Sequence, residues 1–362
     1  MSDFILYISF EGPPDPVPIL ASLRSQKRSL TLVCREPTTA AQENYLKLFE
    51  EFRPTLRYCS DDIEKSSAPY DLSALDLPME PFAPVSGEFF HSLCDYTVLD
   101  RAKQIEECVM VDYAHPRERQ LAIEDEWPAA ALEATSLFIY PTFEHRVARH
   151  AFKQTWPNLK LIVFHNSDYG VDYEGLTSFL ESHPKLYVWA ENSTRWHPRV
   201  RPLPIGEQNR VWRGGDANYE PKNTVSRSPA REINVLAPYW TYTNHWRSIW
   251  TEQVNARKDI VVLPELKKDE YLEKITHCRA LVCPPGNGFD THRCWDALTK
   301  GAWAIVQDNA HTQTLLEQYP SLHLIPVEDM TCPIEIPSRL PPFHPLLLRE
   351  FWRILFKSYT LL

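Results

Sequence analysis

The feature that most constrains the fold is the alternation of short apolar runs with helix-like segments in the second half of the chain. Runs of strand length occur at 232–239, 259–265, 280–285, 302–308 and 322–327. Each is followed by a segment with a helical pattern, apart from the last. Runs that are apolar throughout are typical of parallel strands covered on both faces. This half is therefore predicted to form a doubly wound α/β layer.

The first half shows the same alternation less regularly. Helical patterns lie at 38–52 and 143–156, and the proline-rich stretch 60–110 gives no clear elements. Strand-like runs lie at 4–10, 29–34, 136–141, 160–166 and 185–192. A second α/β layer is the predicted result.

The length and one polar stretch predict two domains. A chain of 362 residues exceeds what a single hydrophobic core usually serves. The stretch 213–231 combines Gly-Gly, two prolines and several turn formers with no apolar periodicity, which is typical of a linker. We therefore expect a first Rossmann-like domain at 1–212 and a second at 232–342.

Charge and hydropathy argue against two kinds of partner. The formal net charge is −10, which disfavours nucleic acid and anionic membranes as general partners. No apolar segment approaches the ~20 residues that span a bilayer, so no membrane span is predicted.

The N-terminus and the cysteines predict the compartment. The apolar run near the N-terminus has no basic flank or cleavage site, so we interpret it as a strand rather than a signal peptide. The eight cysteines form no C-x-x-C, which indicates neither a zinc site nor a disulfide framework. A cytoplasmic location is the prediction.

A glycine-bearing loop marks the candidate site. Residues 283–298 read "CPPGNGFDTHRCWDAL", directly after the strand predicted at 280–285. Gly286, Asn287 and Gly288 form a tight turn, and Asp290 or Thr291 is suited to cap the next helix. A glycine loop that leads from a strand into a helix N-terminus favours phosphate binding.

The helix that follows carries two charged candidates. Arg293 in its first turn can bind a diphosphate, and Asp296 one turn later can accept hydrogen bonds from a ribose. The alternative is that the glycines make an ordinary turn and that Arg293 and Asp296 form a surface ion pair of little energetic value. The residues alone leave both interpretations open.

Residues 271–308 resemble the donor-binding stretch of GT-B glycosyltransferases, especially exostosin-like ones. The looser resemblance extends from 164–170 through 201–209 to the end of the second domain. The positions that match the family pattern are Gly286, Gly288, Asp290, Arg293, Trp295, Asp296, Ala297 and Leu298.

This resemblance implies a fold and a function. The fold would be α/β, with two Rossmann-like domains facing a cleft and a C-terminal helix, within 343–362, that returns to the first domain. The reaction would be metal-independent transfer of a sugar, with inversion, from a UDP- or GDP-linked donor to a hydroxyl of a glycan, with no further cofactor. Arg293 would contact the diphosphate and Asp296 the ribose. The donor loop would comprise Gly286, Asn287, Gly288, Asp290, Thr291 and His292.

One position departs from the family pattern. Pro285 stands where the family has an arginine, which removes one phosphate contact. Arg247, with Thr243 and Asn244, follows the first strand of the second domain and can supply the missing charge. The alternative for Arg247 is an ordinary solvated helix residue.

Three residues of the first domain are candidate catalytic bases. His165 and Asp168 follow the strand at 160–166, and Glu191 follows the next strand. Each can accept the proton of an acceptor hydroxyl within hydrogen-bond reach. The alternatives are a helix cap for Asp168 and a buried core histidine for His165.

Gly206 and Glu207 resemble the family segment near the donor sugar, where an ordinary turn is the alternative. Two rival functions stay open. A nucleotide-sugar epimerase on the same fold would use a donor without an acceptor. A catalytically silent sugar- or nucleotide-binding module is favoured by Pro285, since fold analogy does not establish activity.

Overall fold

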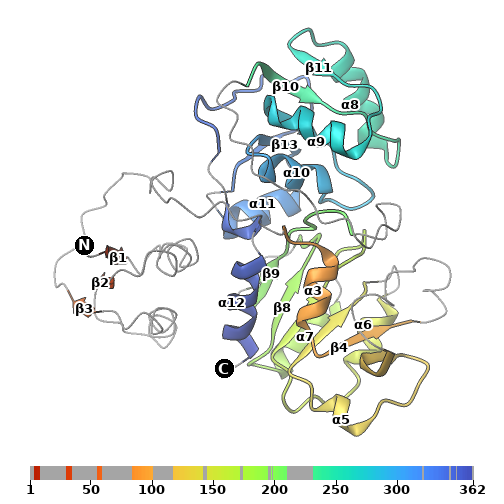
Figure 1. Ribbon diagram of the computed structural model, residues 1–362. Helices are drawn as coiled ribbons and strands as arrows, with labels where there is room; N and C mark the ends of the chain where they lie inside the picture. Colours follow the sequence, from red (N-terminus) through yellow and green to blue (C-terminus); the bar gives the residue numbers. More distant parts are fainter. Residues whose placement is uncertain are drawn as a thin grey trace. The chain divides into compact units, whose positions relative to one another are not determined.

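The structure is a computed structural model (Figure 1). It divides into two compact units, Met1–Glu80 and Pro81–Leu362. The residues it describes are 4–8, 30–34, 55–58, 84–100, 117–141, 145–171, 174–194, 197, 199–209, 231–319, 322–341, 344–347 and 349–360.

The first unit contains a three-stranded parallel sheet in the order β1-β2-β3. The strands are β1 (Phe4–Ile8), β2 (Leu30–Cys34) and β3 (Thr55–Tyr58). The strands predicted at 4–10 and 29–34 are thereby confirmed. The helix predicted at 38–52 lies outside the described residues.

The second unit begins with a six-stranded parallel sheet in the order β5-β4-β6-β7-β8-β9. β6 and β7 are buried along their whole length, as expected for central strands with helices on both faces. Its strands are β4 (Tyr96–Leu99), β5 (Gln120–Ala122), β6 (Ser136–Ile139), β7 (Leu161–Phe164), β8 (Tyr187–Ala190) and β9 (Val200–Pro202). Its helices are α3 (Gly87–Leu93), α5 (Ala129–Leu132), α6 (Arg146–Ala151) and α7 (Glu174–Ser182).

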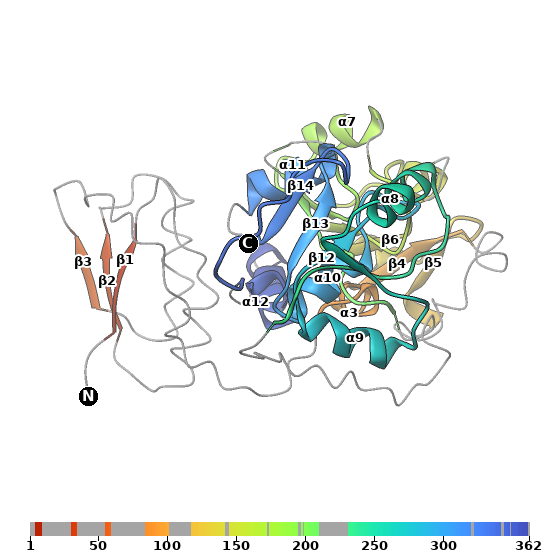
Figure 2. The same cartoon turned by 90° about the horizontal axis from the view of Figure 1, so that it is seen from above.

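The second sheet of this unit has five parallel strands in the order β11-β10-β12-β13-β14. Figure 2 shows α8 and α9 on opposite sides of β12. The strands are β10 (Ile233–Ala237), β11 (Ile260–Val262), β12 (Cys278–Cys283), β13 (Trp303–Gln307) and β14 (Leu324–Val327). The helices are α8 (His245–Asn255), α9 (Lys268–Thr276), α10 (His292–Thr299) and α11 (Ala310–Gln318).

All five strands predicted for the second half are confirmed, as are the strands at 136–141, 160–166 and 185–192. The two parallel sheets of the second unit confirm the predicted α/β class with two Rossmann-like layers, the architecture of the GT-B fold. The strands predicted at 4–10 and 29–34 form, with β3, a three-stranded sheet of their own instead of joining the layer that holds 136–192. The domain boundaries 1–212 and 232–342 stay predictions. The linker 213–231 lies outside the described residues apart from Arg231.

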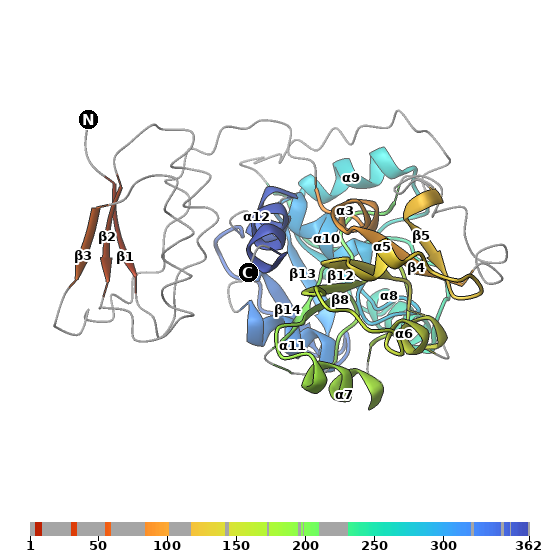
Figure 3. The ribbon, with the colours of Figure 1, turned by 90° about the horizontal axis from the view of Figure 1, so that it is seen from below.

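The C-terminal helix α12 (Arg349–Thr360) packs on the six-stranded sheet rather than on the sheet that precedes it in sequence. The ring of Trp352 is fully buried, with its centroid 5.2 Å from those of Phe90 in α3 and Trp189 in β8. Figure 3 shows α12 beside α3 from below. In the part of the chain that the structure describes, no helix is long and apolar enough to cross a membrane.

Candidate functional site

The order of the five-stranded sheet fixes where a ligand can bind. The chain leaves β10 toward β11 on one side and reaches β12 on the other side. The chain after β10 and the chain after β12 therefore lead away in opposite directions along the sheet. Open α/β sheets bind ligands at such a switch point. Asn244 ties the two loops together. Its Oδ1 accepts from the backbone N–H of Arg247 at 3.1 Å, and its Nδ2 donates to the carbonyls of Pro285 and Gly286.

Two arginines meet at the switch point. Arg247 is 6% exposed, and its Nε donates to the carbonyl of Pro285 at 2.8 Å. Arg293 is partly exposed, and its Nη2 donates to the carbonyl of Tyr239 at 3.2 Å. Burial and then the charge of Arg293 lower the pKa of Arg247 to about 10, so the guanidinium group of Arg247 is still charged at neutral pH. Two adjacent cations held by carbonyl oxygens attract an anion with more than one charge.

The glycines permit close approach at two points of the loop. A Cβ on Gly286 would lie 3.3 Å from Nη2 of Arg247, and a Cβ on Gly288 would lie 2.7 Å from Nδ2 of Asn192. Between them, Asn287 is exposed, and its Nδ2 donates to Oδ2 of Asp168 at 3.1 Å. The loop thereby contacts Arg247 of α8, which packs beside the five-stranded sheet, and Asp168, which follows β7 of the six-stranded sheet.

Asp290 joins the two sheets instead of facing solvent. Its carboxylate accepts from the backbone N–H of Ile205 at 2.8 Å, from that of Thr291 at 2.7 Å and from Nε1 of Trp295. It is 7% exposed, so both oxygens are occupied within the protein. Thr291 occupies the N-cap position of α10 without a side-chain capping bond. Asp290 therefore anchors the glycine loop and does not offer a ligand contact.

Two further predicted donor residues are held by neighbours. Nδ1 of His292 lies 2.8 Å from the carbonyl of Gly206. Asp296 is 2% exposed, and its Oδ2 lies 2.7 Å from Nζ of Lys268. The ion pair considered between Arg293 and Asp296 is thus replaced by one with Lys268. Sequence reasoning missed Lys268, since only its place as the second of two adjacent lysines at the start of α9 marks it.

Glu207 and Gly206 lie at the junction with α3. Gly206 has a φ of 68°, and a Cβ there would lie 2.3 Å from the carbonyl of Val85, so the position requires glycine. The N–H of Glu207 donates to that same carbonyl at 2.8 Å, and Glu207 is buried. Thr243 is exposed, and its N–H donates to the carbonyl of Thr241 at 3.0 Å.

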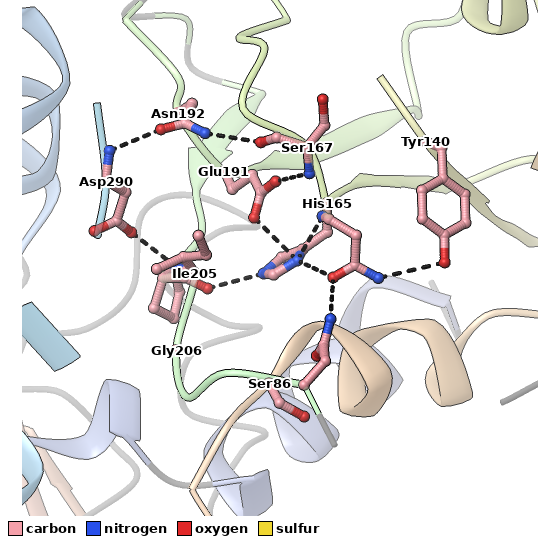
Figure 4. A network of polar contacts seen from close by, with 12 residues as sticks. Ser86, Tyr140, His165, Ser167, Glu191, Asn192, Ile205, Gly206 and Asp290 are labelled. Carbon is pink, nitrogen blue, oxygen red and sulfur yellow. Dashed lines mark hydrogen bonds and ion pairs between the residues drawn. The ribbon is translucent and has the colours of Figure 1, made fainter. Parts of the chain in front are cut away.

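His165 and Glu191 form a buried pair at the ends of β7 and β8 (Figure 4). Nδ1 of His165 lies 3.0 Å from Oε2 of Glu191, and Nε2 lies 3.0 Å from the carbonyl of Pro204. A carbonyl only accepts, so Nε2 carries the proton. Burial lowers the pKa of His165 and raises that of Glu191 well above its usual value. Nδ1 accepts from the backbone N–H of Asn166 at 2.8 Å, and a protonated Glu191 can donate to the same nitrogen in the neutral state.

Asp168 differs from these two candidates in its exposure. Glu191 and His165 are 0% and 1% exposed, whereas Asp168 lies at the surface of the loop after β7. Its carboxylate accepts from Asn287, and its charge acts on Arg247. The structure thus brings Asp168, Asn287, Arg247 and Arg293 together.

Exposed aromatic residues lie on the segments that carry Asp168, Asn287 and Arg247. Tyr239 and Tyr242 lie on the loop after β10, and Trp246 lies in the first turn of α8. Phe289 belongs to the glycine loop, and Tyr169 follows Asp168. Rings that face solvent offer flat surfaces on which a base or a sugar can stack. Within the described ranges, no group of three or more His, Cys, Asp and Glu side chains is arranged to hold a metal ion.

Comparison with known proteins gives only distant similarity. No protein-family model matches the chain, and no curated protein sequence matches it. Among solved structures, CalG4, the calicheamicin glycosyltransferase, is 8% identical at a TM-score of 0.26, with 99% of this chain and 90% of that chain covered. UGT89C1 of Arabidopsis thaliana complexed with UDP is 12% identical at 0.28, with 99% and 91% covered.

A third similar structure is an epimerase. UDP-GlcNAc 2-epimerase from Methanocaldococcus jannaschii is 10% identical at a TM-score of 0.28, with 98% of this chain and 99% of that chain covered. At these TM-scores the similarities carry no argument about function. The function has to be argued from the arginines, the glycine loop and Asp168.

Proposed function

We propose that the chain is a glycosyltransferase that moves a sugar from a nucleotide-diphosphate donor to a hydroxyl of a glycan. The observation that carries this proposal is the pair Arg247 and Arg293 at the switch point of a Rossmann-like sheet. A diphosphate leaving group needs cations where its charge develops, and two fixed guanidinium groups supply them. The exostosin-like motif around Arg293 supports the same conclusion.

The donor would lie over the glycine loop. Gly286 carries no side chain beside Nη2 of Arg247, which leaves room there for a diphosphate, and Tyr239 offers its exposed ring next to Arg293. Asp296 is the proposed ribose ligand; its carboxylate is 2% exposed and paired with Lys268, so this contact requires a rearrangement of that pair. Either UDP or GDP as the nucleotide fits these contacts.

Asp168 is the proposed base. His165 and Glu191 are buried and bonded to one another, so neither can touch a substrate without rearrangement. Asp168 is exposed and contacts the glycine loop through Asn287. In the proposed step Asp168 takes the proton of the acceptor hydroxyl, whose oxygen forms a bond to the anomeric carbon. The bond from that carbon to the diphosphate breaks, with inversion, and the arginines stabilise the departing charge.

Neither a metal nor another cofactor is part of this proposal, because the arginines supply the positive charge. A cytoplasmic location is also proposed. It is supported by the free, buried thiols of Cys94, Cys278, Cys283 and Cys294, which suit a reducing compartment.

A thermal-shift panel tests the proposal. The chain is heated with UDP, GDP, CDP, ADP or TDP, and with UDP-glucose and GDP-mannose, each at millimolar concentration. A ligand that binds only the folded state raises the melting temperature, so we expect one nucleotide to do so selectively. No shift with any of them would favour a silent module, and a donor whose sugar is isomerised without an acceptor would favour an epimerase.

A further inference from the structure

Asn192 bridges the two sheets with a single side chain. It follows Glu191 at the end of β8 and has a φ of 51°, the left-handed region that asparagine tolerates. Its Nδ2 donates to the carbonyl of Ser167 at 3.0 Å, and its Oδ1 accepts from the N–H of Asp290 at 2.8 Å (Figure 4). The amide thus links the loop after β7 to the loop after β12.

The amide of Asn192 lies close against the glycine loop on which the donor would lie. A Cβ on Gly288 would lie 2.7 Å from Nδ2 and 2.9 Å from Oδ1 of Asn192. Asp290 is held in turn by Ile205 and Trp295, so the glycine loop cannot retreat from the amide. Asn192 is itself 1% exposed and therefore packed on all sides.

Asn192 also helps to fix the loop after β7, which carries Asp168. Both backbone groups of Ser167 are bound by consecutive residues, since its N–H donates to Glu191 and its carbonyl accepts from Asn192. The next residue is Asp168, whose carboxylate reaches Asn287. The position of Asp168 relative to the glycine loop is consequently set by Glu191 and Asn192.

We propose that Asn192 is a positioning residue that sets the separation between the carboxylate of Asp168 and the glycine loop on which the donor would lie. The inference rests on the proposed function, in which Asp168 touches the acceptor. Reacting groups must be held within a fraction of an ångström, and a misplacement of about 1 Å can cost ~100-fold in rate. An amide that binds both loops at once meets this demand.

The first test is Asn192→Gly, which accepts a φ of 51° and removes the amide together with its Cβ. The probes are UDP and GDP for binding, and the release of UDP from UDP-glucose or of GDP from GDP-mannose for turnover. We expect nucleotide affinity within about 2-fold of the unaltered chain and release lowered by roughly 10- to 100-fold. Unchanged release, or affinity and release lowered together, would overturn the proposal.

The second test combines Asn192→Gly with Gly288→Ala and uses the melting temperature. Gly288→Ala alone should lower it by about 2 °C or more, because the new Cβ meets the amide of Asn192. In the Asn192→Gly background the same change should have little effect, since the obstructing amide is gone. If the two substitutions lower the melting temperature additively, Gly288 and Asn192 do not contact one another, and the bridge is contradicted.

The two tests separate this inference from the proposed function. An unaltered chain that binds neither nucleotide contradicts the proposed function and the positioning role of Asn192 with it, while the melting temperatures still decide whether the bridge exists. An active chain with an equally active Asn192→Gly variant contradicts the positioning role alone.

Discussion

Nε of Arg247 donates a hydrogen bond of 2.8 Å to the carbonyl oxygen of Pro285, the residue that stands where the exostosin-like pattern has an arginine. The guanidinium of Arg247 in α8, thirty-eight residues earlier in the chain, therefore lies beside this loop position. The carbonyl of Pro285 fixes the guanidinium in place, and Asn244 holds the same carbonyl from the other side. Arg247 thus places a cation next to Pro285, the loop position that lacks one.

Replacing Arg247 by methionine should weaken the binding of UDP or GDP by about 1.5–3 kcal/mol, which is the range of one charge-assisted contact. This corresponds to roughly 10- to 150-fold in the dissociation constant, measured by calorimetric titration. Arg257→Met is the matched control, because Arg257 also belongs to the α8 region but pairs with Asp259. Equal affinity in the two variants would remove Arg247 from the site.

Asp168→Asn should separate binding from turnover. The amide that replaces the carboxylate can still accept from Asn287 but cannot take a proton, so nucleotide affinity should stay within about 2-fold. Release of the nucleotide from its sugar conjugate should fall by about 100-fold or more. A variant with full turnover would exclude Asp168 as the base and return attention to the loop around it.

The pair of Glu191 and His165 predicts how stability depends on pH. Above pH 6.5 neither group holds a titratable proton in the unfolded chain, whereas burial raises the pKa of Glu191 and so favours its protonated form in the folded chain. Because the folded state binds more protons there, its stability should fall as pH rises, by at most about 1.4 kcal/mol per pH unit. Between pH 4.5 and 6.5 the raised pKa of Glu191 and the lowered pKa of His165 change stability in opposite directions, so the pair adds less pH dependence there.

Glu191→Gln should abolish this loss at alkaline pH. The amide keeps the acceptor for Ser167 and can donate to Nδ1 of His165, but it does not ionise. Denaturation midpoints of the two proteins at pH 6 and pH 8 measure the effect, and the unaltered chain should lose more stability over that interval. Parallel changes in both proteins would show that Glu191 is already ionised in the folded state.

Lys268→Met should destabilise the fold through Asp296. The carboxylate is 2% exposed and would lose its salt bridge with Lys268, while the lysine side chain is 30% exposed and costs less to release. We expect a loss of about 1–3 kcal/mol in the free energy of unfolding, measured with denaturant. Adding Asp296→Asn removes the uncompensated charge and should recover part of that loss. A double variant no more stable than Lys268→Met would contradict the pairing.

The second half of the fold was predictable because its strands are continuous apolar runs bounded by turn formers, as in "ALVCPP" before Gly286. The same local signals located the glycine loop and Arg293. Strand β4 was missed because Asp95, Tyr96 and Thr97 give it a polar start. The carboxylate of Asp95 instead binds the N–H groups of Thr135 and Ser136, a contact that no local pattern reveals.

The roles of the buried polar residues could not be predicted, because they depend on contacts between distant segments. Asn192 and Asp290 are 98 residues apart in sequence, and Lys268 and Asp296 belong to different helices. The sequence identified His165 and Glu191 as polar groups after strands, but only their burial distinguishes them from Asp168. Site residues at strand ends were therefore found as a group, and the structure separates those that anchor from those that can touch a ligand.

The return of α12 to the six-stranded sheet has a consequence for the order of synthesis. Trp189 leaves the ribosome more than 160 residues before Trp352, the indole against which it packs. During translation the face of β8 that receives Trp352 and Tyr359 therefore stays uncovered while the whole five-stranded layer is made. A nascent chain stalled before residue 349 should consequently engage chaperones that bind exposed aromatic surface, and release them once the final helix has emerged.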